Sequence, residues 1–191
     1  MNNFILSCKN ISLTLNQVPI IENINFSLYP GEFHLLMGEN GAGKTTLAND
    51  LLNKNYILIN NNLTSESHYD KYVNIIKTSD INSVSDRSFV SEMVYGKVLS
   101  GTTKLSEEEF INLVKLYSEY ETKIIYLYAS KKILLERRKD DFKDSKVIFH
   151  LYQELMDEFE RRLDYISAYI DVFSINTGEK NCKQALAKII K

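Results

Sequence analysis

Eight residues in the first quarter of the chain have the types and spacing to bind a phosphate group. Residues 38–45, GENGAGKT, fit the pattern G-x-x-x-x-G-K-[ST] and stand between an expected strand and an expected helix. Glycines let successive backbone N–H groups curl around a phosphate, and the helix N-terminus adds a favourable dipole. In this pattern Lys44 reaches the β- and γ-phosphates and the Thr45 hydroxyl coordinates Mg²⁺. The motif predicts binding of ATP with Mg²⁺ through Gly38, Glu39, Asn40, Gly41, Ala42, Gly43, Lys44, Thr45 and Thr46.

Asp86 and Arg87 form a second group of residues that can take part in catalysis. They stand at the end of residues 82–86, a short segment expected to be a strand. At the carboxyl end of a strand beside the phosphate-binding loop, Asp86 can hold Mg²⁺ through water or accept a proton from an acceptor hydroxyl. The planar guanidinium of Arg87 can clamp an acceptor phosphate, which favours an acceptor that already carries a phosphate. A surface ion pair or a strand-end cap is the alternative interpretation.

A basic cluster lies at the end of an expected short helix at residues 130–138; its members are Arg137, Arg138 and Lys139. If the segment around residues 137–146 closes as a lid over a bound nucleotide, one of these arginines can neutralise the charge that develops during phosphoryl transfer. We favour Arg137 for this catalytic role, with Arg138 as the second candidate. The alternative is a solvated helix end, which is what most charge runs form.

Binding an acceptor base requires an apolar slot with a few polar groups. Phe89 and Tyr95 are the candidates for stacking on the base, and Ser91 and Glu92 are the candidates for hydrogen bonds to it. The chain contains 12 tyrosines and 9 phenylalanines, so a core position is the alternative for either ring. The histidines are isolated from one another, and we assign none of them a catalytic role.

The elements that must position these residues alternate in type from residue 33 onward. This alternation predicts an α/β fold with a parallel sheet of about five strands covered by helices on both faces. Residues 4–15 and 20–29 precede it and are expected to be an antiparallel pair joined by a turn at residues 16–19. The expected core strands are 32–37, 56–60, 82–86, 123–129 and 171–176, and the expected helices are 44–54, 67–77, 89–99, 106–120, 130–138, 147–168 and 180–190. Ser106 and Glu109 predict a capping box.

Composition excludes several classes of protein. The 191 residues include 23 Lys and Arg against 25 Asp and Glu, which disfavours a nucleic-acid partner held by a broad basic surface. Cys8 and Cys182 lie near opposite ends with no CxxC pair, so neither a structural zinc site nor a disulfide framework is expected. No apolar run is long enough to span a membrane, and no signal peptide is evident. We expect a cytoplasmic protein without a membrane partner, and a homodimer is left open.

Residues 4–50 resemble the start of an ABC-transporter ATP-binding domain. The segment LSCKNISLTLNQVPIIENINFSLYPGEFHLLMGENGAGKTTL has the paired strands, the Pro-Gly-Glu step and the Asn-Gly-Ala-Gly-Lys loop of that family. Leu15 stands where the family usually has an aromatic residue against adenine, and Leu99-Ser100-Gly101-Thr102-Thr103 departs from the Leu-Ser-Gly-Gly-Gln signature. No apolar strand ends in an Asp-Glu pair. We therefore expect this likeness to stop after about a quarter of the chain, and we do not expect an ordinary ABC ATPase.

Residues 33–191 resemble thymidylate kinases and their phage-type relatives. The run DRSFVSEMVYG at residues 86–96 is similar to that family's Asp-Arg motif, and IIYLYASKKILLERRKDD is similar to its strand, helix and arginine-bearing lid. The run DVFSINTGEKNCKQALAKII is similar to the last strand, base-contacting loop and final helix. The resemblance implies a P-loop kinase domain over residues 33–191, with residues 1–32 as an N-terminal β appendage. It also implies that Asn176, Thr177 and Gly178 contact the donor adenine.

The implied activity is transfer of the γ-phosphate of ATP to a small-molecule acceptor, a (deoxy)nucleoside monophosphate. Two alternatives stay open. In one, the kinase acts on a polynucleotide or a modified base. In the other, the chain is an ABC-like regulatory module whose first 30 residues dock a partner.

Overall fold

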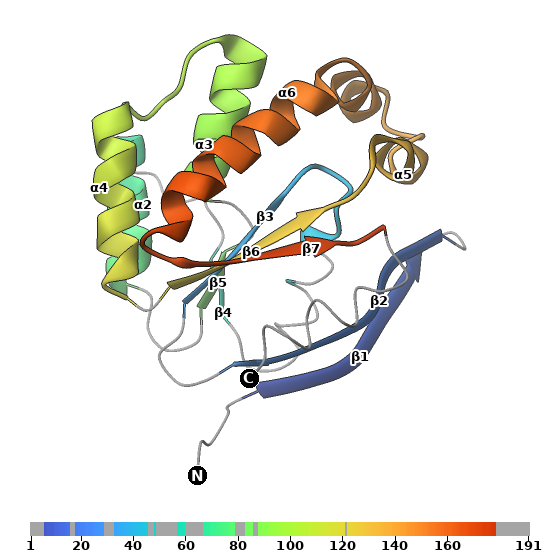
Figure 1. Ribbon diagram of the computed structural model, residues 1–191, viewed down its shortest axis with the longest axis horizontal. Coiled ribbons are helices and arrows are strands. Elements are labelled where there is room, and N and C mark those ends of the chain that lie inside the picture. Colours follow the sequence, from blue (N-terminus) through green and yellow to red (C-terminus); the bar gives the residue numbers. More distant parts are fainter. Residues whose placement is uncertain are drawn as a thin grey trace.

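The computed structural model describes residues 6–15, 18–28, 33–45, 48, 57–59, 67–78, 83–85, 88–120 and 122–178. A parallel sheet with the strand order β4-β5-β3-β6-β7 forms the centre of this part of the chain (Figure 1). β3 lies in the middle of the sheet although it comes first in the sequence. The strands are β3 (Phe33–Gly38), β4 (Ile57–Ile59), β5 (Ser83–Ser85), β6 (Thr122–Tyr128) and β7 (Asp171–Asn176).

The longest strand of this sheet, β6, is apolar because it is covered on both faces. Its residues 124–127 are all buried, as expected for a strand inside a parallel sheet. β6 pairs with β3 from Phe33 opposite Thr122 to Gly38 opposite Leu127. The end of β3 therefore lies directly beside the end of β6, and whatever follows Gly38 starts at this shared carboxyl edge.

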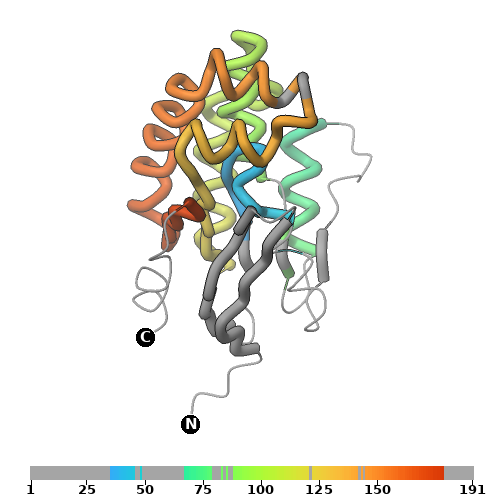
Figure 2. Tube along the Cα trace, turned by 90° about the vertical axis from the view of Figure 1, so that its right-hand side faces the viewer, coloured from blue at the N-terminus to red at the C-terminus, as the bar shows by residue number. Residues whose placement is uncertain are grey.

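Four helices cover one face of the sheet, as Figure 1 shows above β3 and β6. The longest of them, α6, extends along the whole layer and is the orange-to-red tube of Figure 2. Ser106 and Glu109 form the capping box that the sequence predicts at the start of α4, with N–H···O distances of 2.7 and 3.2 Å. The helices of this layer are α2 (His68–Thr78), α3 (Phe89–Tyr95), α4 (Glu107–Ser118) and α6 (Phe142–Ser167), with a π-helical turn, η1 (Gly96–Ser100), after α3.

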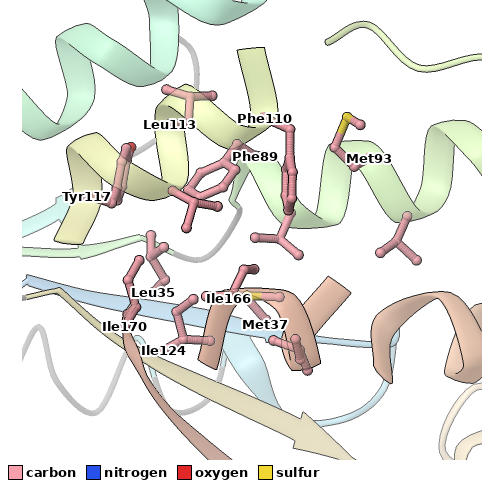
Figure 3. Close-up of a cluster of buried hydrophobic side chains, with 14 of the residues drawn as sticks. Leu35, Met37, Phe89, Met93, Phe110, Leu113, Tyr117, Ile124, Ile166 and Ile170 are labelled. Carbon is pink, nitrogen blue, oxygen red and sulfur yellow. The ribbon is translucent and has the colours of Figure 1, made fainter. Parts of the chain in front are cut away.

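The hydrophobic core lies between this helical layer and the sheet. Phe89 is fully buried, with its ring centroid 6.0 Å from that of Tyr72, 5.7 Å from that of Phe110 and 4.9 Å from that of Tyr117. Figure 3 shows the rings of Phe89, Phe110 and Tyr117 above Leu35, Met37 and Ile124 of the sheet. The Tyr117 hydroxyl donates to the Tyr72 carbonyl oxygen over 2.9 Å, so its polar end is satisfied inside the core.

A buried ion-pair network joins α4, the π-helical turn and α6. Arg162 is only 2% exposed and donates to Glu158 over 2.8 Å and to both carboxylate oxygens of Glu107 over 2.6 Å. Lys97 donates to Glu158 over 2.9 Å. Burial acts to raise the pKa of Glu158, but hydrogen bonds from Arg161, Lys97 and Arg162 outweigh it and bring that pKa to about 2. The network ties three elements of the helical layer together.

Helix α6 begins at Phe142, five residues before the predicted start at residue 147. The segment 137–146 holds the end of α5 (Lys131–Arg137), a turn and the first residues of α6. Its closure as a lid over a bound nucleotide stays a prediction. Leu151 has φ −118° and ψ 15°, so α6 is kinked there. The charged run that opens this helix has no apolar period of 3.6 residues, which is why the sequence pattern does not reveal it.

The N-terminal strands β1 (Leu6–Leu15) and β2 (Val18–Leu28) pair antiparallel in a two-stranded sheet of their own. Leu15 is opposite Val18, and Pro19 is opposite Thr14. Pro19 therefore belongs to β2 and not to the predicted turn at residues 16–19. A proline has no N–H to donate, and it is tolerated here because both strands of a two-stranded sheet are edge strands.

Candidate nucleotide-binding site

The candidate site lies at the carboxyl edge of the sheet, where parallel α/β sheets bind their ligands. β3 ends at Gly38 beside Leu127, and β7 ends at Asn176 opposite Tyr128. The arrowheads of β6 and β7 in Figure 1 point toward α5 at this edge. The phosphate-binding loop predicted from the sequence starts here, between a central strand and the helical residues 44 and 45.

The backbone of this loop depends on its glycines. Gly38, Gly41 and Gly43 have φ values of 140°, 90° and 97°, a region that L side chains rarely adopt. A Cβ atom on Gly38 would lie 1.9 Å from the Leu127 carbonyl oxygen, so only glycine allows the strand to turn this close to β6. The Ala42 N–H donates to the Glu39 carbonyl oxygen over 3.1 Å and closes the first turn of the loop.

The lysine and threonine of the motif lie at the end of the loop, where the sequence predicts them to meet a phosphate and Mg²⁺. Lys44 Nζ donates to the Glu39 carbonyl oxygen over 3.0 Å, which holds the ammonium group against the loop. Thr45 is exposed at the start of the helical segment, where a hydroxyl is accessible to a cation. A glycine-lined backbone cradle, an ammonium group and an exposed hydroxyl are the donor set that fits the phosphates of ATP and Mg²⁺. Thr46 lies outside the described residues.

One side of the loop is held by Arg137 of α5. Its guanidinium donates to the Gly41 carbonyl oxygen over 3.2 Å, to the Thr177 hydroxyl over 3.0 Å and to the Thr177 carbonyl oxygen over 2.9 Å. Thr177 is in turn fixed to β6, because its N–H donates to the Tyr128 carbonyl oxygen over 2.7 Å. Arg137 thus joins the phosphate-binding loop to the residues after β7, two regions that the sequence analysis assigns to the same nucleotide.

The neighbouring residues on this side play smaller parts. The aliphatic stem of Arg138 lies against Gly41, where a Cβ atom would come within 3.0 Å of Arg138 Cγ. Its guanidinium lies 3.6 Å from the Asp141 carboxylate. The Asn176 side-chain oxygen accepts a hydrogen bond from the Gly178 N–H over 2.9 Å and closes the turn after β7. Arg138 therefore packs its stem against the loop, whereas Arg137 donates a hydrogen bond to it.

The other side of the loop is formed by a buried carboxyl group. Glu39 is 1% exposed, and its Oε1 accepts a hydrogen bond from the Tyr126 hydroxyl over 2.8 Å. Burial raises the pKa of the Glu39 carboxyl above its usual range. The phosphate-binding motif accounts for Glu39 through its backbone alone, and no sequence pattern predicts Tyr126. The one signal for Tyr126 is its register opposite Met37, the residue immediately before the loop.

The structure gives a different role to two of the predicted acceptor-binding residues. Phe89, predicted to stack on a base, is fully buried among core rings and offers no surface to a ligand. Ser91 belongs to the cap of α3, because its N–H donates to the Ser88 side-chain oxygen over 3.3 Å. A match to a sequence motif does not specify which residues of a helix face the core and which face a ligand.

The two other acceptor candidates, Tyr95 and Glu92, are partly exposed. Tyr95 is half-buried, and its ring packs edge-on against Phe159 at a centroid distance of 6.0 Å. The Glu92 carboxylate lies 3.5 Å from the ammonium group of Lys104. Asp86 and Arg87 lie outside the described residues, which resume at Ser88, the cap of α3.

Within the described ranges, no group of three or more histidine, cysteine, aspartate or glutamate side chains could hold a metal ion by itself. The same part of the chain contains no helix with the length and hydropathy needed to cross a membrane.

Solved structures with the same fold include P-loop kinases. YorR from Bacillus subtilis, in complex with phosphorylated GDP, has a TM-score of 0.64 at 20% identity, covering 82% of this chain and 92% of that one. Deoxyadenosine kinase from M. mycoides with bound dCTP has a TM-score of 0.51 at 15% identity, covering 82% and 96%. Polyphosphate kinase 2 from Arthrobacter aurescens TC1 has a TM-score of 0.54 at 16% identity, covering 83% and 68%. The predicted α/β fold with a parallel sheet is confirmed.

Sequence relatives belong to another group. The profile of the ABC transporter family matches residues 21–147. The probable ABC transporter ATP-binding protein p29 of Mycoplasma pneumoniae is 30% identical over 188 residues, covering 88% of this chain and 75% of p29. The chain covers 33% of the xylose import ATP-binding protein XylG of Geobacillus kaustophilus, at 28% identity over 165 residues. It covers 19% of the probable ATP-dependent transporter ycf16 of Antithamnion sp., at 45% identity over 47 residues.

These matches correct one expectation. The likeness to ABC proteins was expected to stop near residue 50, but the family profile continues to residue 147. The structure shows what occupies the places of two family motifs. β6 is followed by Ala129-Ser130 and not by an Asp-Glu pair. Gly101 of the Leu-Ser-Gly-Thr-Thr run ends the π-helical turn with a φ of 68°. ATP with Mg²⁺ is the cofactor pair of ABC ATPases and of P-loop kinases. By its sequence, the chain belongs to the ABC transporter family.

Proposed function

We propose that this chain is a phosphotransferase that moves the γ-phosphate of ATP to a small nucleotide acceptor, a (deoxy)nucleoside monophosphate. The observation that carries the proposal is the placement of Arg137, whose guanidinium lies on the Gly41 carbonyl oxygen of the phosphate-binding loop. Phosphoryl transfer depends mainly on positioning and on positive charge around the transferring group. A helix that delivers an arginine to the loop supplies such a charge.

The sequence after β6 favours transfer to an acceptor over hydrolysis. An ATPase of the ABC kind relies on a carboxylate pair after an apolar strand to hold Mg²⁺ and activate water. β6 is followed by Ala129 and Ser130, which offer no carboxylate. The supporting fold likeness comes from proteins that include kinases, with TM-scores of 0.51 to 0.64.

Each residue of the site has a separate part in the proposed reaction. The backbone N–H groups of the loop and Lys44 bind the phosphates of the donor, and Thr45 holds Mg²⁺, which supplies charge neutralisation when bound. Arg137 stabilises the charge that develops between donor and acceptor, and Arg138 stands beside it. Asp86 and Arg87 act on the acceptor side: Arg87 clamps its phosphate, and Asp86 orients the metal or the attacking group.

A coupled ADP-release assay with Mg²⁺ and ATP tests this proposal. The panel contains nucleoside monophosphates, deoxynucleosides and short single-stranded DNA, and Lys44→Ala serves as the blank. We expect one small acceptor to stimulate ADP release strongly. Stimulation by DNA alone would replace the acceptor with a polynucleotide. Silence across the panel from a chain that binds ATP would overturn the kinase proposal.

Membership in the ABC transporter family favours one second candidate, an ATP-binding module that acts through a partner chain. This function predicts slow ATP turnover that no small acceptor stimulates and that a partner protein accelerates. Recovery of such a partner with the full-length chain, and its loss on removal of residues 1–30, would favour this candidate over the kinase.

A further inference from the structure

The side chain of Glu39 has a hydrogen-bonding position that the protein does not fill. Oε1 accepts from the Tyr126 hydroxyl, but Oε2 is buried and has no hydrogen-bond partner among the described residues. A buried carboxylate oxygen without a partner costs free energy, and such groups in folded proteins usually have one. The position is adjacent to the phosphate-binding loop, whose first residue after Gly38 is Glu39 itself.

The direction of this side chain is fixed by its surroundings. The Glu39 carbonyl oxygen accepts hydrogen bonds from Lys44 Nζ and from the Ala42 N–H, so its backbone faces the interior of the loop. Its carboxyl group instead meets β6 and α6, because the Tyr126 hydroxyl that holds it also lies 3.4 Å from Met156 Sδ. Glu39 therefore connects the phosphate-binding loop to β6 and α6.

Two tyrosines from different elements interact with this carboxyl group. Burial and, to a smaller degree, the Glu39 carboxyl raise the pKa of Tyr126 of β6 and the pKa of Tyr152 of α6. Tyr152 is half-buried, donates to the Ala129 carbonyl oxygen over 3.1 Å and follows the kink of α6 at Leu151.

The chemistry of a carboxyl oxygen limits what can occupy this position. An ionised carboxyl oxygen accepts hydrogen bonds and repels a phosphate at short range. An acceptor nucleotide therefore meets Oε2 with a neutral donor group and not with its phosphate. An acceptor nucleoside carries two kinds of neutral donor, the sugar hydroxyls and the N–H groups of the base. The transferring phosphate belongs on the other side of the loop, beside Arg137 and Lys44.

We propose that Oε2 of Glu39 accepts a hydrogen bond from a neutral donor of the acceptor nucleoside, either a sugar hydroxyl or a base N–H group. The inference rests on the proposed function, since it needs a nucleoside acceptor. The acceptor then lies between the loop and α6 and reaches Glu39 past Tyr152. Tyr126 is a positioning residue, because it holds the carboxyl group in this direction.

The test compares Glu39→Gln with a matched control, Glu154→Gln, which changes an exposed glutamate of α6. Each deoxynucleoside and its monophosphate is offered beside a 2′,3′-dideoxy analogue and beside an analogue that lacks the exocyclic amino group. In the unchanged chain we expect loss of the paired donor to lower kcat/KM about 100-fold, because a site built to bind a donor rejects a ligand without it. In Glu39→Gln that discrimination should fall below about threefold. The arm that loses discrimination identifies the donor as sugar or base.

Three readouts keep the outcomes apart. The affinity for methylanthraniloyl-ATP reports the donor side and should change less than about threefold in Glu39→Gln, because the substitution keeps the backbone contacts of Glu39 with Lys44 and Ala42. Calorimetric titration of the acceptor needs no turnover. An unchanged chain that binds an acceptor without releasing ADP would overturn the proposed function, while weaker binding in Glu39→Gln would still support the contact.

If the ratio of kcat/KM between acceptor and analogue is the same in the unchanged chain, Glu39→Gln and Glu154→Gln, the inference is overturned. The partner of Oε2 would then be a buried water. Absence of both binding and turnover for every acceptor would overturn the inference together with the kinase. If Glu39→Gln does not fold, Glu39→Asp takes its place: it keeps the carboxyl group but withdraws it by one methylene, and the same loss of discrimination is expected.

Discussion

The two sides of the phosphate-binding loop differ in charge and in origin. The side toward α5 carries a guanidinium, held by hydrogen bonds to Gly41 and to Thr177. The side toward α6 carries a buried carboxyl group held by a tyrosine. Positive charge stabilises a transferring phosphoryl group, and a buried carboxyl repels it. Under the proposed function, this difference in charge assigns the guanidinium to the donor side of the loop and the carboxyl group to the acceptor side.

The largest effect on turnover should come from a substitution of Lys44, because the motif assigns this lysine to the phosphates of ATP whichever side of the loop is considered. Lys44→Ala removes the ammonium group that reaches the β- and γ-phosphates, and we expect ATP-dependent turnover to fall at least about 100-fold. The coupled ADP-release assay measures this loss. Turnover within about threefold of the unchanged chain would remove the loop from the reaction and end the comparison between its sides.

The α5 side is tested by Arg137→Lys. A lysine keeps the charge but cannot bond the Gly41 carbonyl, the Thr177 hydroxyl and the Thr177 carbonyl at once. We expect kcat to fall about 10- to 100-fold, with weaker binding of methylanthraniloyl-ATP. Arg138→Lys is the matched control, and its effect should be smaller because Arg138 contacts the loop through its aliphatic stem. An effect of Arg138→Lys equal to that of Arg137→Lys would remove the reason for preferring Arg137.

The α6 side is tested by Tyr126→Phe. The ring stays against Phe159 and Tyr128, but the hydroxyl that holds Glu39 Oε1 is lost. We expect the KM for the acceptor to rise about tenfold while ATP affinity stays nearly unchanged, because the hydroxyl acts only on the acceptor side. Steady-state kinetics with each substrate varied in turn measures the split. A change in ATP affinity as large as the change in acceptor KM would contradict the division of the loop into two sides.

The smallest effect on activity, and a clear one on stability, should come from the buried ion-pair network. Glu158 has a pKa of about 2 in the folded protein against an ordinary value of 4.5. Its stabilising contribution is therefore present above about pH 4.5 and is lost as the pH falls toward 2. Glu158→Gln should lower the free energy of unfolding by about 2–4 kcal/mol near neutral pH, because Arg162 loses a charged partner.

Thermal unfolding of both chains between pH 3 and pH 7 checks this prediction. The difference in stability between the unchanged chain and Glu158→Gln should shrink as the pH falls. A constant difference over that range would mean that the charge of Glu158 does not contribute. Turnover near neutral pH should change little, because no residue of the network contacts the phosphate-binding loop.

The sequence supports the site unequally. The loop, its lysine and its threonine follow from a contiguous motif, so all of their contacts are local. Arg137 also follows from the sequence, but its partner does not: Gly41 and Arg137 are 96 residues apart, and only the folded chain brings them together. Tyr126 and Glu39 are separated by 87 residues, and no local pattern marks a strand tyrosine as the partner of a loop glutamate.

The family of this chain follows from its sequence, and its fold follows from its structure. The family profile matches residues 21–147, whereas the solved structures of similar fold include kinases at 15–20% identity. Identity accumulates where a motif constrains the side chains directly. A parallel sheet covered by helices tolerates many apolar sequences with the same pattern, so its fold can be shared at low identity.

By itself the sequence determined the α/β alternation, the phosphate-binding loop and the capping box of α4, because each depends on residues that are close along the chain. The tertiary structure alone decided which side chains face a ligand. It places Phe89 in the core, holds Arg137 on the loop and turns the carboxyl group of Glu39 toward α6. The physical reason is that burial and long-range hydrogen bonds depend on how the elements pack, which no local spacing of residues specifies.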